Sequence, residues 1–164
     1  MLKVKKAVLA DLGRIMEIYR SAQDFMIGSG NPDQWGHIYP EEALIVSDIR
    51  DGLCHILYDE SGIHGVMALC EGADPTYQYI ENGGWLNDGP YVTIHRIAGD
   101  GNVHGIVRCA ADYCKRLYCN IRIDTHAKNT VMQRKIEEQG FIICGIIYVE
   151  DGSARLAYQW TAAR

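Results

Sequence analysis

The chain has 164 residues, of which 48% are hydrophobic and 23% are charged, and its formal net charge is −5. This length fits one domain that buries its core without disulfides or structural metals. The negative charge argues against a general affinity for nucleic acid or for anionic membranes. No apolar run reaches the roughly 18 residues needed to span a membrane, and the N-terminus does not have the pattern of a signal peptide. The six cysteines form no CxxC pair and mostly lie in apolar runs. We therefore expect reduced thiols and a cytoplasmic protein.

The first half of the chain predicts a strand, two helices and a hairpin. Residues 2–8 alternate polar and apolar side chains, which is typical of an edge strand. Asp11 then caps a helix whose pattern fades by Gly28, and Pro40 opens a second helix that Gly52 ends. Strands over residues 53–59 and 63–72, separated by a turn, predict an antiparallel hairpin. Two long connections, 28–40 and 72–90, are rich in loop-forming and aromatic residues, and long connections in compact domains are often functional.

The second half predicts alternating strands and helices. The expected elements are a strand over 90–99, a helix over 103–118, a strand over 119–126, a helix over 128–140, and strands over 141–149 and 153–160. The full order is β-α-α-β-β-β-α-β-α-β-β. It predicts a single α/β domain over 1–164, with a mixed sheet of about seven strands and helices on both faces. The crossover over 90–125 should be right-handed.

A glycine-rich turn lies where the strand at 90–99 gives way to a helix. Gly99, Gly101 and Gly105 let the backbone approach a ligand closely. The free N–H groups and the dipole at the start of the helix can bind a phosphate without Lys or Arg. The sequence has no P-loop motif and no Rossmann glycine fingerprint. The turn is therefore a candidate pyrophosphate site, with a simple tight turn as the alternative.

Over nearly the whole chain, the order of elements resembles that of the GCN5-related N-acetyltransferase (GNAT) family, and two segments resemble motifs of that family. HRIAGDGNVHGI is similar to that family's motif A, a strand that runs into a Q/R-x-x-G-x-G/A loop and a helix. IDTHAKNTVMQRKIEEQGFIICGII is similar to its next motif, in which an Asn and a Gly-Phe frame a helix; here these are Asn129 and Gly140-Phe141. The resemblance implies that acetyl-CoA binds, without a metal, between two parallel strands that splay apart, 90–98 and 119–125, whose free backbone groups suit the pantetheine amides. The cofactor-binding residues expected on this basis are Ile97, Ala98, Gly99, Gly101, Asn102, Val103, His104, Gly105, Ile106 and Asn129.

The chain departs from the family pattern at three positions. Asn102 stands where Gln or Arg is usual, and Val107 stands where Gly or Ala is usual. Ile136 occupies the position at which many members carry a tyrosine that acts as general acid. The resemblance therefore leaves the source of the acid open: another side chain or solvent.

Acetyl transfer to an amine needs a general base and a donor for the oxyanion. His95 is a candidate base, with a hydrogen-bonded core histidine as the alternative. Asp124 is a candidate for orienting substrate or accepting a proton, with a turn-capping role as the alternative. The family resemblance places the oxyanion donor in the backbone of residues 97–99. Arg96 is expected on the opposite face from His95, because side chains alternate along a strand.

Aromatic and acidic side chains in the two long connections are candidates for the acceptor pocket. We expect substrate-binding roles for Trp35, Tyr79, Glu81 and Trp85. The alternative is that these side chains pin the long connections to the domain.

Three interpretations follow from the sequence. The first is an acetyltransferase acting on a primary amine of a small molecule or peptide. The second is a non-catalytic acyl-CoA-binding or regulatory module. The third is a metal site built from His95, His104, His126 and cysteines, which no HxxxH or CxxC spacing supports. An exposed edge strand near the C-terminus could also pair with a second copy to form a homodimer.

Overall fold

The computed structural model describes residues 1–163. Its strands are β1 (Lys3–Lys6), β2 (Cys54–Asp59), β3 (Gly62–Glu71), β4 (Val92–Gly99), β5 (Asn120–Thr125), β6 (Ile142–Tyr148) and β7 (Ala154–Thr161). Its helices are α1 (Leu12–Gly28), α2 (Glu42–Arg50), α3 (Ile106–Leu117) and α4 (Thr130–Glu138), with two short 3-10 turns, η1 (Leu9–Asp11) and η2 (Pro75–Tyr77). The predicted order of strands and helices is confirmed.

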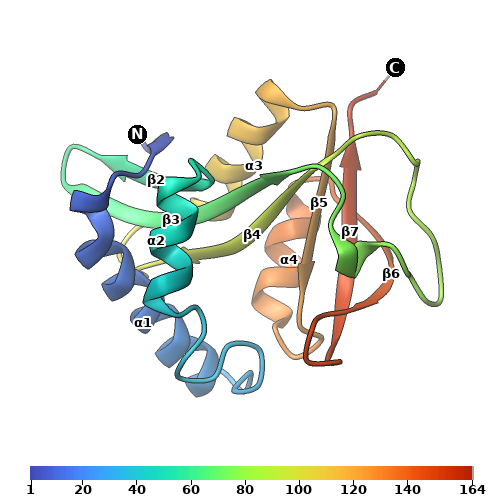
Figure 1. Cartoon of the computed structure of the whole chain (residues 1–164), viewed down its shortest axis with the longest axis horizontal. Helices are drawn as coiled ribbons and strands as arrows, with labels where there is room; N and C mark the ends of the chain where they lie inside the picture. The colour runs from blue at the N-terminus through green and yellow to red at the C-terminus, as the bar shows by residue number, and fades with distance from the viewer. Residues whose placement is uncertain (164) are drawn as a thin grey trace.

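All seven strands form one mixed sheet in the order β1-β2-β3-β4-β5-β7-β6 (Figure 1). Only β4 and β5 pair in parallel, and every other neighbouring pair is antiparallel. The predicted hairpin is the β2–β3 pair. β1 is one edge, as expected, and β6 is the other. Glu81 pairs with Ile146 of β6, so residues of the 72–90 connection cover part of that edge.

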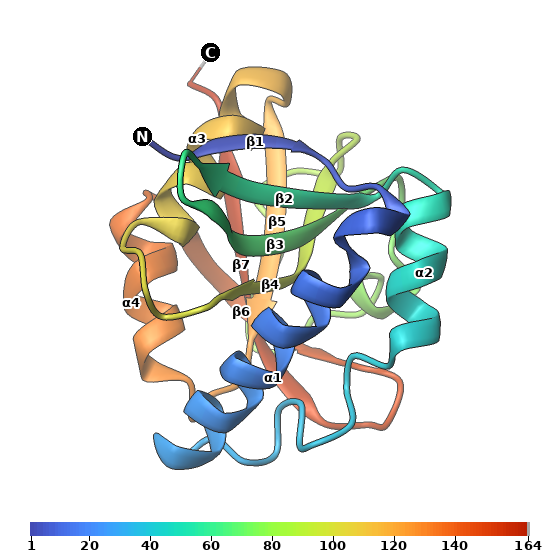
Figure 2. The same cartoon turned by 90° about the vertical axis from the view of Figure 1, so that its left-hand side faces the viewer.

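The helices cover both faces of the sheet, as predicted (Figure 2). One core cluster lies between α3, α4 and the sheet, and it includes Val107, Ile123 and Ile136. A second cluster lies between α1, α2 and the other face, and it includes Ile15, Ile45 and Val66. The 72–90 connection covers the second face over β5, β7 and β6, where Tyr77 packs against Ile147 and Ala157.

Three local features differ from the sequence-based expectation. The first strand ends at Lys6 because the chain turns into η1, and the Asp11 carboxylate accepts a hydrogen bond from the Val8 N–H. Asp11 is the N-cap residue of α1, but its side chain bonds no amide of that helix. α3 begins at Ile106 and not near Val103, because residues 101–104 form a loop and Gly105 lies in the left-handed region with φ of 87°.

The 72–90 connection is held on β5 by polar and stacking contacts. The Arg122 guanidinium lies between two aromatic rings, 4.0 Å from the Trp85 ring centre and 3.8 Å from that of Tyr91. It also donates a hydrogen bond to the Asn87 carbonyl, and Asn120 donates to the Asn87 side chain. This anchoring fixes Asp74 and Tyr77 over the middle of the sheet.

Candidate active site

The two parallel strands part after three residue pairs. Val92 to Ile94 pair with Ile121 to Ile123, and then β4 continues to Gly99 and β5 to Thr125 without pairing with each other (Figure 1). Arg96 has φ of 51°, and the β3–β4 register shifts at the same place, so β4 bulges as it leaves β5. The opening expected from the sequence is therefore present.

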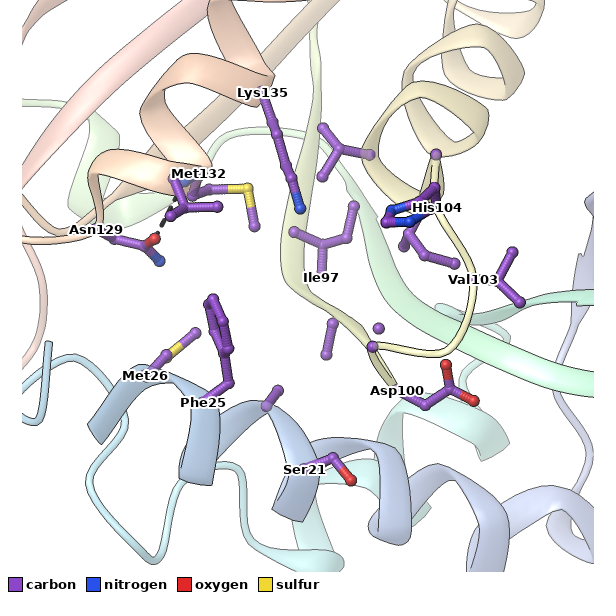
Figure 3. A pocket seen from close by; sticks show the side chains of 18 residues that line it. Ser21, Phe25, Met26, Ile97, Asp100, Val103, His104, Asn129, Met132 and Lys135 are labelled. Carbon is purple, nitrogen blue, oxygen red and sulfur yellow. Dashed lines mark hydrogen bonds between the residues drawn. The ribbon is translucent and has the colours of Figure 1, made fainter. Parts of the chain in front are cut away.

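A pocket of about 460 Å³ lies beside this opening, bounded by β4, the 100–105 loop and α1, α3 and α4 (Figure 3). Its lining from α1 is Ser21, Ala22, Phe25 and Met26. Its lining from β4, the loop and α3 is Ile97, Ala98, Gly99, Asp100, Gly101, Val103, His104, Gly105, Ile106 and Val107. From α4 and its cap it receives Asn129, Val131, Met132 and Lys135. Such a mostly apolar pocket with few polar groups is typical of a ligand site.

The start of α3 supplies main-chain donors to this pocket. The first amide bonded inside the helix is that of Cys109, which donates to the Gly105 carbonyl. The amides of the three residues before it have no acceptor within the helix. A Cβ on Gly99 would lie 3.0 Å from Ile106, so the glycine lets the helix tip approach the strand closely. A helix tip with free N–H groups binds anions such as phosphate.

Asn129 organises the α4 side of the pocket. Its side-chain oxygen accepts from the Met132 N–H and caps α4, and its Nδ2 donates to the Gln34 side chain in the α1–α2 connection. The pair links the second of the two sequence motifs to the connection at 28–40. The cap explains why an Asn stands at the start of this helix.

Phe25 and Lys135 line the pocket and were not predicted from the sequence. Phe25 is 58% exposed, which is high for a phenylalanine. Its ring is therefore available to pack against a ligand in the pocket. Lys135 extends from α4 toward the pocket (Figure 3). The spacing of Asn129, Met132 and Lys135 by three residues would have placed Lys135 on this side of α4.

The structure brings together all but one of the residues expected to bind the cofactor. Asn102 does not line the pocket, and its N–H donates to the Asp100 carboxylate at 2.9 Å. Ile136 also lies outside the pocket, buried in the core between α4 and the sheet. Val107 lines the pocket while packing in the same core.

His95 and Asp124 are the first residues beyond the last parallel pair, Ile94 with Ile123. Because those two isoleucines face α3 and α4, alternation turns His95 and Asp124 to the opposite face. There, His95 Nε2 lies 2.7 Å from the Asp74 carboxylate. The Tyr77 hydroxyl donates to Asp124 at 2.6 Å, and its ring centre lies 6.0 Å from that of His95. The structure thus gathers both candidate catalytic residues with Asp74 and Tyr77 of the 72–90 connection, whose aromatic and acidic side chains the sequence indicated for the acceptor pocket.

The two carboxylates of this group are perturbed in opposite directions. Burial raises the pKa of Asp124, against the effects of His95 and of the Tyr77 hydrogen bond. Burial also acts to raise the pKa of Asp74, but hydrogen bonds from His95 and Thr76 outweigh it and lower that pKa to about 2. Solvent still reaches the group, since the His95 side chain is 22% exposed. Asp74 is therefore fixed as an anion, whereas the anionic form of Asp124 is poorly stabilised.

The expected substrate-binding residues lie in three different places. Trp35 packs edge-on against Tyr19, whose hydroxyl donates to the Arg96 carbonyl at the β4 bulge. Trp85 donates its indole N–H to the Tyr77 carbonyl and stacks on Arg122. Tyr79 is exposed, and Glu81 accepts a hydrogen bond from Tyr148 at the β6 edge. Of the four, Trp35 is therefore the one next to the bulge.

Arg96 does not lie opposite His95 as alternation predicted. The bulge resets the pleat, and the Arg96 guanidinium binds the Asp48 carboxylate of α2 at 2.8 Å. The Arg96 charge also acts on the Cys70 thiol. Burial and the Asp74 charge raise the pKa of this thiol, and the Arg96 charge lowers it. Arg96 is thus a structural ion pair on the face that carries His95.

Among residues 1–163, no group of three or more His, Cys, Asp or Glu side chains is placed to hold a metal ion. No helix in this part of the chain is both long and apolar enough to cross a membrane.

Solved structures with the same fold are GNAT acetyltransferases. A GNAT-family acetyltransferase from Streptococcus agalactiae matches with a TM-score of 0.91 and 26% identity, covering 99% of this chain and 96% of its own. A GNAT-family acetyltransferase from Listeria monocytogenes matches with a TM-score of 0.71 and 19% identity, covering 98% of this chain and 94% of its own.

The ribosomal-protein-S18-alanine N-acetyltransferase from Escherichia coli matches with a TM-score of 0.62 and 16% identity, covering 100% of this chain and 96% of its own. No protein-family model and no curated protein matches the chain. On the fold, the strand order and these neighbours, the chain has the structure of a GNAT acetyltransferase.

Proposed function

We propose that this protein transfers an acetyl group from acetyl-CoA to a primary amine of a small molecule or peptide. The observation that carries the proposal is the parting of β4 and β5. A pocket with free helix-tip amides lies along the parted end of β4, and a His–Asp pair stands at the point of parting. The resemblance to GNAT acetyltransferases supports acetyl transfer in general.

The residues of the pocket fit acetyl-CoA as a co-substrate. The 101–106 loop and helix tip would hold the diphosphate, and Lys135 would add a positive charge. The unpaired edges of β4 and β5 offer main-chain groups to the pantetheine amides. Bound acetyl-CoA would supply the activated acyl group.

The side chains at the point of parting fit the proton transfers. His95 would remove the proton from the acceptor ammonium, and Asp74 would hold its ring and stabilise the imidazolium. Backbone N–H groups of residues 97–99 would stabilise the oxyanion. The Asp74 carboxylate, which is fixed as an anion, would attract a cationic acceptor.

An acyl-CoA-binding module without catalytic activity is the second candidate. It is favoured by Ile136, a buried aliphatic residue at the position where many GNAT enzymes carry a tyrosine acid. The chain would then bind acetyl-CoA and release no thiol with any acceptor.

Thiol release from acetyl-CoA, measured against a panel of primary amines and peptides, separates the two. We expect release that depends on the amine and is lost in His95→Gln. Binding of acetyl-CoA without release across the panel would support the module. Absence of binding would contradict both.

We further propose a cytoplasmic location and no nucleic-acid or membrane partner. All six cysteines are free thiols, which suits a reducing compartment. The homodimer expected through the C-terminal edge stays a prediction. Its candidate surface is the part of β6 with exposed Ile142 and Ile143.

A further inference from the structure

One carboxylate lies in the loop proposed to bind the diphosphate. Asp100 is the single Asp or Glu among the described residues that line the pocket, and it directly follows β4. A free carboxylate here would repel a diphosphate a few ångströms away. Diphosphate binding at this loop therefore requires that the Asp100 charge be neutralised or directed away from the pocket.

The Asp100 carboxylate is turned away from the pocket and bound by two basic side chains (Figure 3). Arg14 of α1 donates to its Oδ2 at 2.5 Å, and His64 Nδ1 of β3 lies 3.1 Å from the same oxygen. Its other oxygen accepts from the Asn102 N–H. The side chain of Asp100 is only 3% exposed, so all of its charge is met by protein groups.

His64 is itself held between two carboxylates. Its Nε2 lies 3.1 Å from Asp59 and 2.8 Å from the Ser61 hydroxyl, which bonds Asp59 in turn at 2.6 Å. Each ring nitrogen of His64 therefore faces a carboxylate, Nδ1 that of Asp100 and Nε2 that of Asp59. Arg14 also donates to the Ile63 carbonyl and to Glu17.

The pKa values of the two carboxylates agree with this arrangement. Burial acts to raise the pKa of Asp100, but the Asn102 N–H and His64 lower it overall. Hydrogen bonds from Ser61, with a smaller effect of His64, lower the pKa of Asp59 to about 2. Both carboxylates therefore stay ionised, and the Arg14 guanidinium lies against that of Asp100.

We propose that Arg14 and His64 are positioning residues for acetyl-CoA: they hold the Asp100 carboxylate out of the pocket and cancel its charge, so that the loop and the α3 tip accept a diphosphate. This inference rests on the proposed function of the pocket. It assigns a role to residues from α1 and from the β2–β3 hairpin, which do not themselves touch the ligand.

A double-mutant cycle on Arg14 and Asp100 tests the proposal by titration of the full chain with acetyl-CoA. Arg14→Gln should raise the Kd about tenfold, because Asp100 keeps its charge without its partner. Asp100→Asn alone should leave the Kd within about threefold of wild type or tighten it. The double variant should bind like Asp100→Asn, which a merely structural role of Arg14 would not produce.

Two controls make the outcome specific. Arg20→Gln removes an exposed charge from the same helix and should leave the Kd unchanged. Acetyl-pantetheine lacks the diphosphate, so Arg14→Gln should not alter its binding. An unchanged Kd in Arg14→Gln, no rescue by Asp100→Asn, or equal losses for both ligands overturns the proposal. Wild-type protein that binds no acetyl-CoA overturns the proposed function instead, and this proposal with it.

Discussion

The two faces of the sheet at the parted strands present different chemical groups. The pocket side uses main-chain amides, glycines and apolar side chains, and its one carboxylate is turned away. The opposite side uses four polar side chains, Asp74, His95, Tyr77 and Asp124, from segments far apart in the sequence. Main-chain sites tolerate changes of side chain, whereas side-chain sites depend on each residue. Substitutions on the two sides should therefore have separable effects, on cofactor affinity and on turnover.

The largest effect is expected at His95. His95→Gln should lower kcat about 100-fold or more, because the proposed base is lost. The Kd for acetyl-CoA should stay within about twofold, since the ring lies on the face away from the pocket. Steady-state rates and titration measure the two quantities.

His55 provides a matched control for this substitution. It is a buried histidine of β2, bonded to the Leu53 carbonyl and remote from the site, so His55→Gln should keep kcat. A similar kcat in His95→Gln would contradict the assignment.

The next effect concerns the glycine at the start of α3. Gly105 has φ of 87°, and a Cβ there would meet no protein atom, so it would occupy ligand space. Gly105→Val should raise the Kd for acetyl-CoA about 100-fold and Gly105→Ala about tenfold, with a cost of roughly 1–2 kcal/mol in stability.

Substitution of Gly152 is a control that introduces the same backbone strain without occupying ligand space. It has φ of 80° and equally open surroundings, but lies in the β6–β7 turn. Gly152→Val should cost similar stability and leave the affinity for acetyl-CoA intact. Equal affinities for the two valine variants would show that the diphosphate site has been misplaced.

A smaller effect is expected on thermal stability, and it distinguishes Asp124 from Asp74. The pKa of Asp124 is raised by burial, so its ionised form is a cost at neutral pH, and Asp124→Asn should raise Tm by a few degrees. The pKa of Asp74 is lowered to about 2, so Asp74→Asn should lower Tm at neutral pH. That loss should shrink as pH falls from about 4, the unfolded value, toward about 2. Thermal melts against pH measure both, and shifts of the same sign would refute the electrostatic account.

The smallest effect is expected at Val107, where the family usually has Gly or Ala. Val107→Ala should change the Kd for acetyl-CoA by less than about threefold, because main-chain groups carry the site. It should cost about 1–2 kcal/mol of stability, since the side chain packs in the core. Binding tightened tenfold would mean instead that Val107 obstructs the diphosphate.

The fold and the pocket side could be predicted because their signals are local. Hydrophobic periodicity predicted the order of strands and helices, Asn129 marked the start of α4, and the glycine-rich turn placed the start of α3 to within three residues. The same residues are close in sequence to the groups they organise. Apart from Asn102, the expected cofactor-binding set lines one pocket.

The opposite side could not be predicted because its partners are distant in sequence. Asp74 reaches His95 across 21 residues of a connection without periodicity, and Tyr77 reaches Asp124 across 47. Arg14 meets Asp100 across 86 residues. The bulge at Arg96 also interrupts the alternation of side chains between the two faces of β4. One residue in the left-handed region changes the face toward which the following side chains point.

A crystal structure of the wild-type protein with acetyl-CoA tests the central claim most directly. The account predicts pantetheine density between the unpaired ends of β4 and β5, with the diphosphate against residues 101–106 and the acetyl group near His95. Acetyl-CoA bound elsewhere on the molecule, or strands that pair to their ends when it binds, would contradict it.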